Sequence, residues 1–199
     1  MDIVKVKNYT APPINVKELN RYAGYGKLDT LSNEISECLI EAEPYLTYKV
    51  CYLETEIKVD NDKVDFGFNT VKSASLANRL KGLQKAIVFV ATVGLGIDRL
   101  INKYGKISPL KSLIFQSIGA ERVESLIEVF VNELNENYIK SNKALTSRFS
   151  AGYGDFSLSF QKDIFEVLNV NKNIGVTLNE SLIMSPSKSV TAVIGVKNL

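Results

Sequence analysis

The chain has 199 residues, of which 45% are hydrophobic and 23% charged, and these proportions exclude a disordered or collagen-like protein. Its 24 Lys and Arg residues against 22 Asp and Glu residues give a net charge of +2, too weak a field to favour binding to nucleic acid. The sequence contains no histidine, which excludes His-based acid–base pairs, Ser-His and Cys-His nucleophiles, His metal sites and with them most hydrolase mechanisms.

The chain opens with two predicted helices. Asn15 can cap a helix whose apolar residues recur at helical spacing and which ends in the glycine-bearing turn 24–26. Asp29 or Thr30 can cap a second helix, which has to stop before Pro44. We therefore expect two short helices ahead of the first long strand.

The next segment predicts strands around one further helix. Over residues 47–59, every second side chain falls on one face, as in a strand. The polar turn 60–63 then leads into a second strand, and together they indicate a β-hairpin. A helix opens at Ser73, and the unbroken apolar run 86–91 predicts a strand that is buried on both faces. The glycines at 94–96 complete neither a dinucleotide motif nor a phosphate loop, so we interpret them as a tight structural turn.

Ser108 and Pro109 are a good cap and first-turn pair for the longest predicted helix, 110–138. Its apolar residues form a broad stripe along one side, which is typical of a helix packed on a core. Gly119 and Ala120 inside this helix indicate close packing of another backbone.

The C-terminal third begins with a long polar segment, 140–159, and a loop of that length is uncommon unless it is functional or disordered. A helix over 162–168 and strands over 174–184 and 189–196 follow, the last two expected to form an antiparallel hairpin. The order of elements predicts an α+β (mixed α/β) fold over 1–199. We expect a single compact domain with a largely antiparallel sheet, a long central helix and a C-terminal β-hairpin.

Other features concern the compartment. Cys38 and Cys51 lack metal or redox spacing, and Cys38 falls on an apolar helix face, which favours a buried free thiol and a reducing compartment. Residues 1–5 carry no apolar run of a signal peptide, and no segment approaches the ~18 consecutive apolar residues of a membrane span. We expect a cytoplasmic protein that contacts no membrane.

The segment 148–155 holds side chains suited to a charged nucleoside. Arg148 offers a planar fork for a carboxylate or phosphate, and Gly152 and Gly154 let a ligand approach the backbone. Tyr153 offers an aromatic face to a planar base or a cation. These groups suit a zwitterionic, adenine-bearing ligand; the alternative is an ordinary solvated turn.

The residues Arg-Phe-Ser-Ala-Gly-Tyr at 148–153 resemble the R-x-x-x-G-Y segment of the activation domain of cobalamin-dependent methionine synthase. Further segments follow in the family's order: Phe-Glu-Val-Leu at 165–168, Ile-Gly-Val-Thr-Leu-Asn-Glu-Ser-Leu-Ile-Met at 174–184, Pro186, and Ser-Val at 189–190. The resemblance is best over 108–196, and the chain is similar to the short, free-standing versions of this domain.

The resemblance implies binding of S-adenosylmethionine and repair of a cobalamin enzyme. In the family, one electron from flavodoxin or another reductase is coupled to methyl transfer from S-adenosylmethionine, which returns inactive Co(II) cobalamin to methylcobalamin. The irreversible loss of a methyl group draws the unfavourable reduction forward. Cobalamin then belongs to a partner, a cobalamin-binding methionine synthase chain, and this chain contributes no catalytic residue and no metal site.

Carried over by position, the resemblance assigns four residues of the loop to S-adenosylmethionine. Arg148 is expected near the methionyl carboxylate, and Ser150 and Gly152 occupy backbone contact positions. Tyr153 would face the adenosine or the sulfonium. This set is the candidate binding site.

The chain departs from the family at the helix glutamate that helps to hold the ligand. A gapless reading puts Ser125 at that position, with Glu124 beside it, so either Glu124 serves after a small shift or the ammonium is held differently. The chain also stops at Leu199, before a family aromatic that contacts the ligand. An incomplete pocket predicts weaker binding, unless the partner closes it.

Two other functions remain open at this stage. The chain could be a docking or chaperone-like module for a corrinoid protein, without a ligand of its own. It could also reactivate a different corrinoid methyltransferase, in which case only the partner differs.

Overall fold

A five-stranded antiparallel sheet runs through the middle of the computed structural model, which describes residues 3–26 and 28–199. Met1 and Asp2, which belong to the segment read for a signal peptide, lie outside the described residues. The strands, in spatial order, are β1 (Lys5–Tyr9), β2 (Tyr48–Glu56), β6 (Lys85–Thr92), β10 (Ser189–Asn198) and β7 (Lys143–Leu145). Every neighbouring pair is antiparallel, and β6 lies at the centre between β2 and β10.

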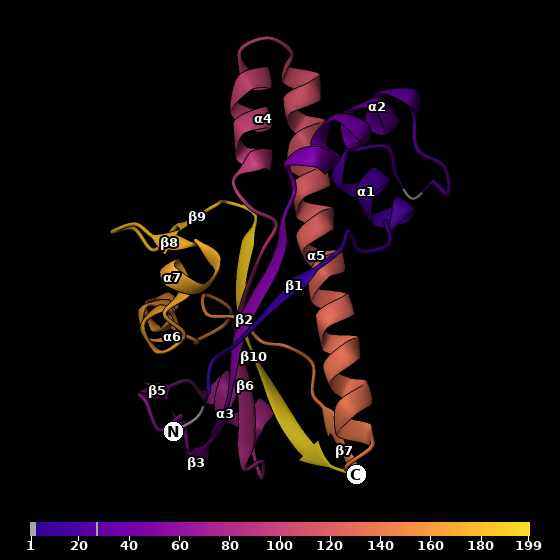
Figure 1. Cartoon of the computed structure of the whole chain (residues 1–199). Helices are drawn as coiled ribbons and strands as arrows, with labels where there is room; N and C mark the ends of the chain where they lie inside the picture. The colour runs from indigo at the N-terminus through magenta and orange to yellow at the C-terminus, as the bar shows by residue number, and fades with distance from the viewer. Residues whose placement is uncertain (1–2, 27) are drawn as a thin grey trace.

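Helices cover one face of this sheet (Figure 1). They are α1 (Val16–Tyr22), α2 (Asn33–Ala42), the 3₁₀ turn η1 (Glu43–Tyr45), α4 (Gly96–Gly105) and the long α5 (Pro109–Ile139). The helix α5 passes along the whole sheet, and α4 packs beside its first turns. None of the helices in the described part of the chain combines the length and hydropathy needed to cross a bilayer.

Smaller elements cover the opposite face. Its helices are α3 (Ala74–Leu80), η2 (Leu158–Phe160), α6 (Gln161–Val167) and α7 (Val170–Ile174). Two small antiparallel sheets join them: β3 (Lys58–Asp60), β4 (Lys63–Asp65) and β5 (Thr70–Lys72) in one, β8 (Thr177–Leu178) and β9 (Met184–Ser185) in the other. The molecule therefore has three layers, with the main sheet as the central one.

The central strands supply side chains to a core on each face. Along β6, Phe89 and Ala91 belong to the core under α5, whereas Val88 and Val90 belong to the other core, as the alternation of a strand requires. Every residue of β6 after Lys85 is buried, which confirms the prediction of a strand covered on both faces.

The predicted fold class is confirmed: the structure is mixed α/β, with one compact domain, an antiparallel sheet and a long helix. The partner expected for the last strand is wrong, because β10 pairs with β6 along its length and with β7 at its end. The residues expected to form the other arm of the hairpin lie mostly outside strands. Ile174 ends α7, and Gly175 closes that helix with φ +74, a left-handed conformation that favours glycine.

Most helix starts are confirmed by capping hydrogen bonds. Three side chains accept a backbone N–H of the first turn where the sequence predicts a cap: Asn15, Ser73 and Ser108. The second helix starts later than expected, at Asn33, because Ser32 caps it in place of Asp29 or Thr30. All of these residue types accept such a bond, so composition alone does not choose among them.

Two glycines permit close approaches between elements. A Cβ on Gly96 would lie 2.1 Å from the carbonyl oxygen of Tyr45, so the turn before α4 has a structural requirement for glycine, as predicted. A Cβ on Gly119 would instead meet side-chain carbons, those of Lys188 at 2.7 Å and of Ile97 at 3.0 Å. The expectation of a second backbone against Gly119 is therefore wrong.

Candidate functional site

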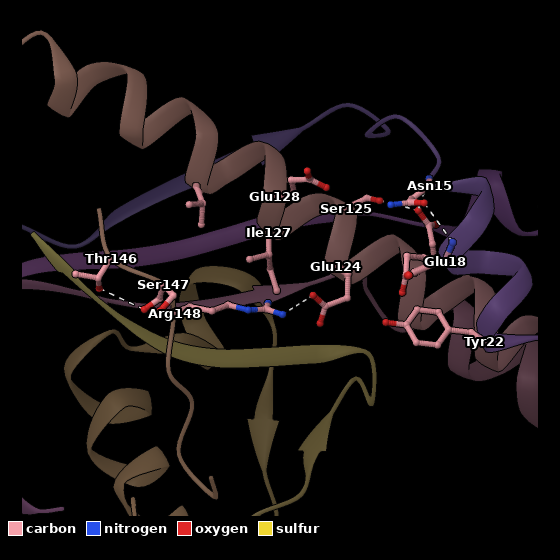
Figure 2. Close-up of a pocket in the computed structure, with 12 residues that line it drawn as sticks. Asn15, Glu18, Tyr22, Glu124, Ser125, Ile127, Glu128, Thr146, Ser147 and Arg148 are labelled. Atoms are coloured by element: carbon pink, nitrogen blue, oxygen red, sulfur yellow. Dashed lines mark hydrogen bonds and ion pairs between the residues drawn. The ribbon is translucent and has the colours of Figure 1, made fainter. Parts of the chain in front are cut away.

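Two cavities share Arg148 and Glu124 as lining residues. The helix cavity, of about 380 Å³, lies between α1, α5 and the segment 146–148 (Figure 2). The loop cavity, of about 430 Å³, lies between the segment 148–153, α6 and the start of β10. The ion pair of Arg148 and Glu124 thus stands at the boundary of both spaces.

The segment 146–149 runs along the outer edge of β10, which fixes the direction of Arg148. The Thr146 N–H donates to the Gly195 carbonyl at 2.9 Å, and Phe149 and Val193 exchange two backbone hydrogen bonds of 2.8 Å each. Arg148 lies between these attachments, and Figure 2 shows its side chain directed at α5. This backbone pairing is why an apparently irregular loop presents an ordered guanidinium.

Arg148 pairs with Glu124 across the boundary of the cavities. Its Nη2 donates to the Glu124 carboxylate at 2.5 Å, and the two side chains are 35% and 41% exposed. The Arg148 Nη1 is buried and finds no hydrogen-bond acceptor among the described residues. One side of the guanidinium therefore remains available to an anionic group.

The rest of the predicted loop forms one rim of the loop cavity. Ser150 and Tyr153 line it, and Tyr153 is 66% exposed. Gly152 has φ +94, and its N–H donates to the Phe156 carbonyl at 2.7 Å. The glycine allows the chain to turn back on itself here, because an L side chain rarely adopts that φ.

Asp155 anchors the end of this loop to the first turn of α3. Its carboxylate accepts hydrogen bonds from the Ser73 hydroxyl at 2.7 Å and from the backbone N–H groups of Ala74 and Ser75 at 2.6 and 3.1 Å. The Ser73 hydroxyl, followed by the contacts from Ser75 and Ala74, lowers the pKa of Asp155 to about 2. The loop is thereby held by a charged group at a helix N-terminus.

Aromatic rings support the same loop from below. Phe149 stacks on Phe156 with a centroid distance of 5.9 Å, and Phe156 contacts Phe160 at 5.5 Å. The Arg79 guanidinium lies 4.5 Å from the centre of the Phe149 ring. Phe149 lines the loop cavity, and these contacts hold its ring in place from the side of the core.

Gln161 is a lining residue that the sequence analysis missed. It is 5% exposed, and its Nε2 donates to the Thr191 hydroxyl at 3.1 Å. Its Oε1 is buried and accepts no hydrogen bond from any described residue. Its spacing could have revealed it: Gln161 lies three residues before Ile164 and seven before Leu168, on the apolar side of a helix. A polar side chain that is buried there requires a hydrogen-bond partner.

A buried ion pair, whose acidic member Glu121 lines the helix cavity, was also missed. Arg122 and Glu121 are each 1% exposed and pair at 2.6 Å. Arg122 also donates to the Pro12 and Pro13 carbonyls at 2.6 and 3.0 Å. Glu121 accepts two further hydrogen bonds, from the Asn15 N–H at 2.8 Å and the Ser125 hydroxyl at 2.6 Å. The network fixes the segment before α1 against α5.

The structure brings most of the predicted site residues together. Arg148, Ser150, Tyr153 and Glu124 all line the loop cavity, and Gly152 belongs to the same rim. Ser125, the position of the family glutamate in a gapless reading, lines the helix cavity and bonds Glu121. No group of three or more potential metal-ligating side chains gathers within residues 3–26 and 28–199.

The fold and the paired cavities define a mixed α/β domain with an ionic site at the edge of its sheet. The sequence matches the family model described as the vitamin B12 dependent methionine synthase activation domain over residues 61–198. The chain belongs to this family, which confirms the resemblance seen in the sequence. The matched range includes Glu124 and the segment 148–153, whereas α1 precedes it.

A solved structure has a similar fold. It is described as the crystal structure of the MetH reactivation domain bound to AdoHcy, and it superposes with a TM-score of 0.72 at 16% sequence identity. The alignment covers 97% of this chain and 78% of that one. The comparison with curated proteins found no match.

Proposed function

We propose that this chain binds S-adenosylmethionine at Arg148 and Glu124 and presents its methyl group to a separate, cobalamin-carrying methionine synthase chain. Ser150, Gly152 and Tyr153 form the rest of the binding site. The observation that carries the proposal is the ion pair at the boundary of the two cavities, within a chain of the activation-domain family.

The charges of the ion pair match the amino-acid end of the ligand. A methionyl group carries a carboxylate and an ammonium on one carbon, so it can insert between Arg148 and Glu124 and give each a new partner of opposite charge. The buried, unpaired Nη1 of Arg148 offers the carboxylate a second donor. Breaking the existing pair costs about 0–1 kcal/mol because both side chains are partly exposed.

The similar solved structure supports the same ligand class. Its description states that it is bound to AdoHcy, S-adenosylhomocysteine, which has the same amino-acid and adenosine groups as S-adenosylmethionine and lacks only the transferred methyl group. A site built from charges and an aromatic rim suits both molecules. Their common parts are what Arg148, Glu124 and Tyr153 would contact.

The chemistry demands little of this chain beyond holding the methyl donor. The partner's cobalamin, the substrate of the repair, supplies a Co(II) centre that takes up one electron from flavodoxin or another reductase and the methyl group, while the sulfonium is left as the thioether of S-adenosylhomocysteine. The carbon–sulfur bond breaks as the carbon–cobalt bond forms, and no proton moves. A chain without histidine is compatible with that role.

We take residues 1–199 as one domain with this function. The family match begins at residue 61, but Glu18 and Tyr22 of α1 line the helix cavity, and the buried Arg122 contacts the segment before α1. These contacts support treating the N-terminal helices as part of the same unit.

Calorimetric titration with S-adenosylmethionine tests the proposal. We expect the wild-type chain to bind, more tightly when the cobalamin partner is present, and Arg148→Ala to bind at least tenfold more weakly, because a charged hydrogen-bonded contact contributes about 1.5–3 kcal/mol. Arg99→Ala, which removes an exposed arginine on α4, is the matched control and should bind as wild type. No binding by wild type, with or without the partner, would overturn the proposal.

A second experiment follows the methyl group itself. The chain is mixed with the Co(II) form of the partner, a reductant and methyl-labelled S-adenosylmethionine, and label on cobalt is measured. We expect label transfer to require this chain and to fall with Arg148→Ala. Transfer at the same rate without the chain would contradict the proposed role.

One observation favours a docking module as the second candidate. Arg148 and Glu124 already neutralise each other, so a chain that only recognises a corrinoid protein would not need a ligand there. That function predicts partner binding that is indifferent to S-adenosylmethionine and to Arg148→Ala in a pull-down. A reactivator of a different corrinoid methyltransferase would use the same site, and only assays with both partner types separate it from the first proposal.

A further inference from the structure

We propose that the Gln161 side-chain carbonyl accepts a hydrogen bond from the 6-amino group of adenine, so that Gln161 selects an adenosyl ligand over one with a different base. The proposal rests on the function proposed above, and it adds a specificity-determining residue to that site. It also divides the ligand between the two ends of the loop cavity.

The starting point is a buried acceptor without a donor. Gln161 is the first residue of α6 and is 5% exposed, and it lines the loop cavity. In the structure its Nε2 donates to the Thr191 hydroxyl, and its Oε1 accepts nothing from the described residues. Buried side-chain carbonyls are nearly always hydrogen-bonded, so this oxygen has an acceptor position that a donor from outside the chain can fill.

The loop cavity lies beside the start of β10, where the outer edge of this strand pairs with no other strand among the described residues. On one edge of β10, Ser189 and Thr191 pair with β6. On the other edge, the first residue of β10 to pair with another backbone among the described residues is Val193, which pairs with Phe149. A ligand in this gap can extend from one face of the sheet to the other. The two ends of the cavity therefore come from different layers of the molecule.

The alternation of side chains along β10 shows which layer of the molecule forms each end of the loop cavity. Val193 belongs to the core on the α6 face and Ala192 to the core under α5, so Thr191, two residues from Val193, faces α6. Glu124 comes from α5, on the other face. With the amino-acid group held by Arg148 and Glu124, the end of the cavity at Gln161 is left for the nucleoside.

The chemistry of that end fits a purine with an amino group. Tyr153 and Met184 also line the cavity and offer an aromatic ring and a thioether to the flat face of a base. At the edge of the base, the 6-amino group of adenine donates, which is what the Gln161 Oε1 lacks. A 6-oxo group in its place presents a second carbonyl oxygen and is disfavoured.

The test compares S-adenosylhomocysteine with S-inosylhomocysteine, in which a 6-oxo group replaces the 6-amino group, by calorimetric titration. We expect wild type to bind the adenosyl compound about tenfold more tightly. Gln161→Met, which keeps the length of the side chain without its carbonyl, should bind the two compounds within about twofold of each other, through weaker binding of the adenosyl compound. Gln116→Met, an exposed position on α5, is the matched control and should keep the wild-type ratio.

The wild-type ratio needs no variant, so the proposal is testable even where Gln161→Met folds poorly. Equal affinities in wild type, or an unchanged ratio in Gln161→Met, would overturn this proposal and leave the proposed function intact. A preference for the 6-oxo compound would also overturn it, since that places the amide N–H groups toward the base. Absence of binding by either compound, with and without the cobalamin partner, would overturn both proposals.

Discussion

Asp155 shows how a single carboxylate anchors one end of the loop that carries the candidate site. It lies two residues after Tyr153 and is held by the Ser73 hydroxyl and two N–H groups of α3. These contacts favour its ionised form, which is why its pKa is lowered to about 2 from the ordinary value of 3.8. The loop is therefore attached most firmly when Asp155 is charged.

This attachment predicts a stability difference that depends on pH. Because the pKa of Asp155 is lower in the folded than in the unfolded chain, its contribution is fully present above about pH 4 and is lost as the pH falls toward about 2. Urea unfolding should show Asp155→Asn less stable than wild type at neutral pH, with the difference shrinking over that range. A difference that stays constant down to about pH 2 would contradict the assignment.

The motif residues could be predicted from the sequence because Arg148 and Tyr153 lie close together in one short segment. Gln161 and Glu121 could not, because their roles depend on distant segments. Gln161 acquires its partner from β10, thirty positions along the chain, and Glu121 acts through the segment before α1. Local spacing carries no information on either contact.

At the scale of elements, α5 is tied to the N-terminal segment by a buried charge. Arg122 is 1% exposed, and Glu121 supplies its countercharge inside the protein. Removing one member of such a pair leaves the other charge buried without compensation, which is far more costly than breaking a pair at the surface. The position of α1, and with it one wall of the helix cavity, depends on this pair.

We expect Glu121→Ala to lower the free energy of unfolding by about 3–5 kcal/mol, because it leaves the Arg122 guanidinium unpaired. Urea titration followed by circular dichroism measures the change. Glu128→Ala, at an exposed position on the same helix, is the matched control and should change stability by no more than about 0.5 kcal/mol. A loss below about 1 kcal/mol in Glu121→Ala would contradict the role of the pair, and Glu121→Leu combined with Arg122→Met should cost less than Glu121→Ala.

Elements with a strong local signal were predictable, and the segment 174–184 was not. The helix α5 has a capping serine, a first-turn proline and 31 residues of pattern, and β6 has an unbroken apolar run, so each is specified locally. The residues 174–184 were expected to form one strand, yet they contain the end of α7, the two-residue strand β8 and the first residue of β9. Packing against the main sheet decides between these outcomes, and local propensity does not.

At the scale of the whole molecule, the main sheet is shared by two cores, and each core contains one cysteine. Cys38 lies in the core under α5 and Cys51 in the opposite core, and both are 0% exposed free thiols. Burial raises the pKa of Cys38 and raises that of Cys51 to about 12. Neither thiol should react in the folded protein at about pH 8.

The shared sheet predicts that both cores open in one transition. In the single-cysteine variants Cys38→Ala and Cys51→Ala, the remaining thiol should react with a thiol reagent over the same range of urea as the loss of helical signal in that variant. The double variant, without thiols, corrects for background reaction. A thiol that became reactive well before the helical signal was lost would show that one layer opens alone, and would contradict a single cooperative unit over 1–199.

The 66% exposure of Tyr153 bears on how the proposed methyl transfer would take place. A ligand whose base rests on this ring would lie at the surface of the molecule, so the acceptor could approach it without any gate opening in this chain. The rate of transfer would then be governed by the alignment of two docked surfaces. Substitutions outside the cavities that disturb this alignment would slow transfer while leaving the affinity for the donor unchanged.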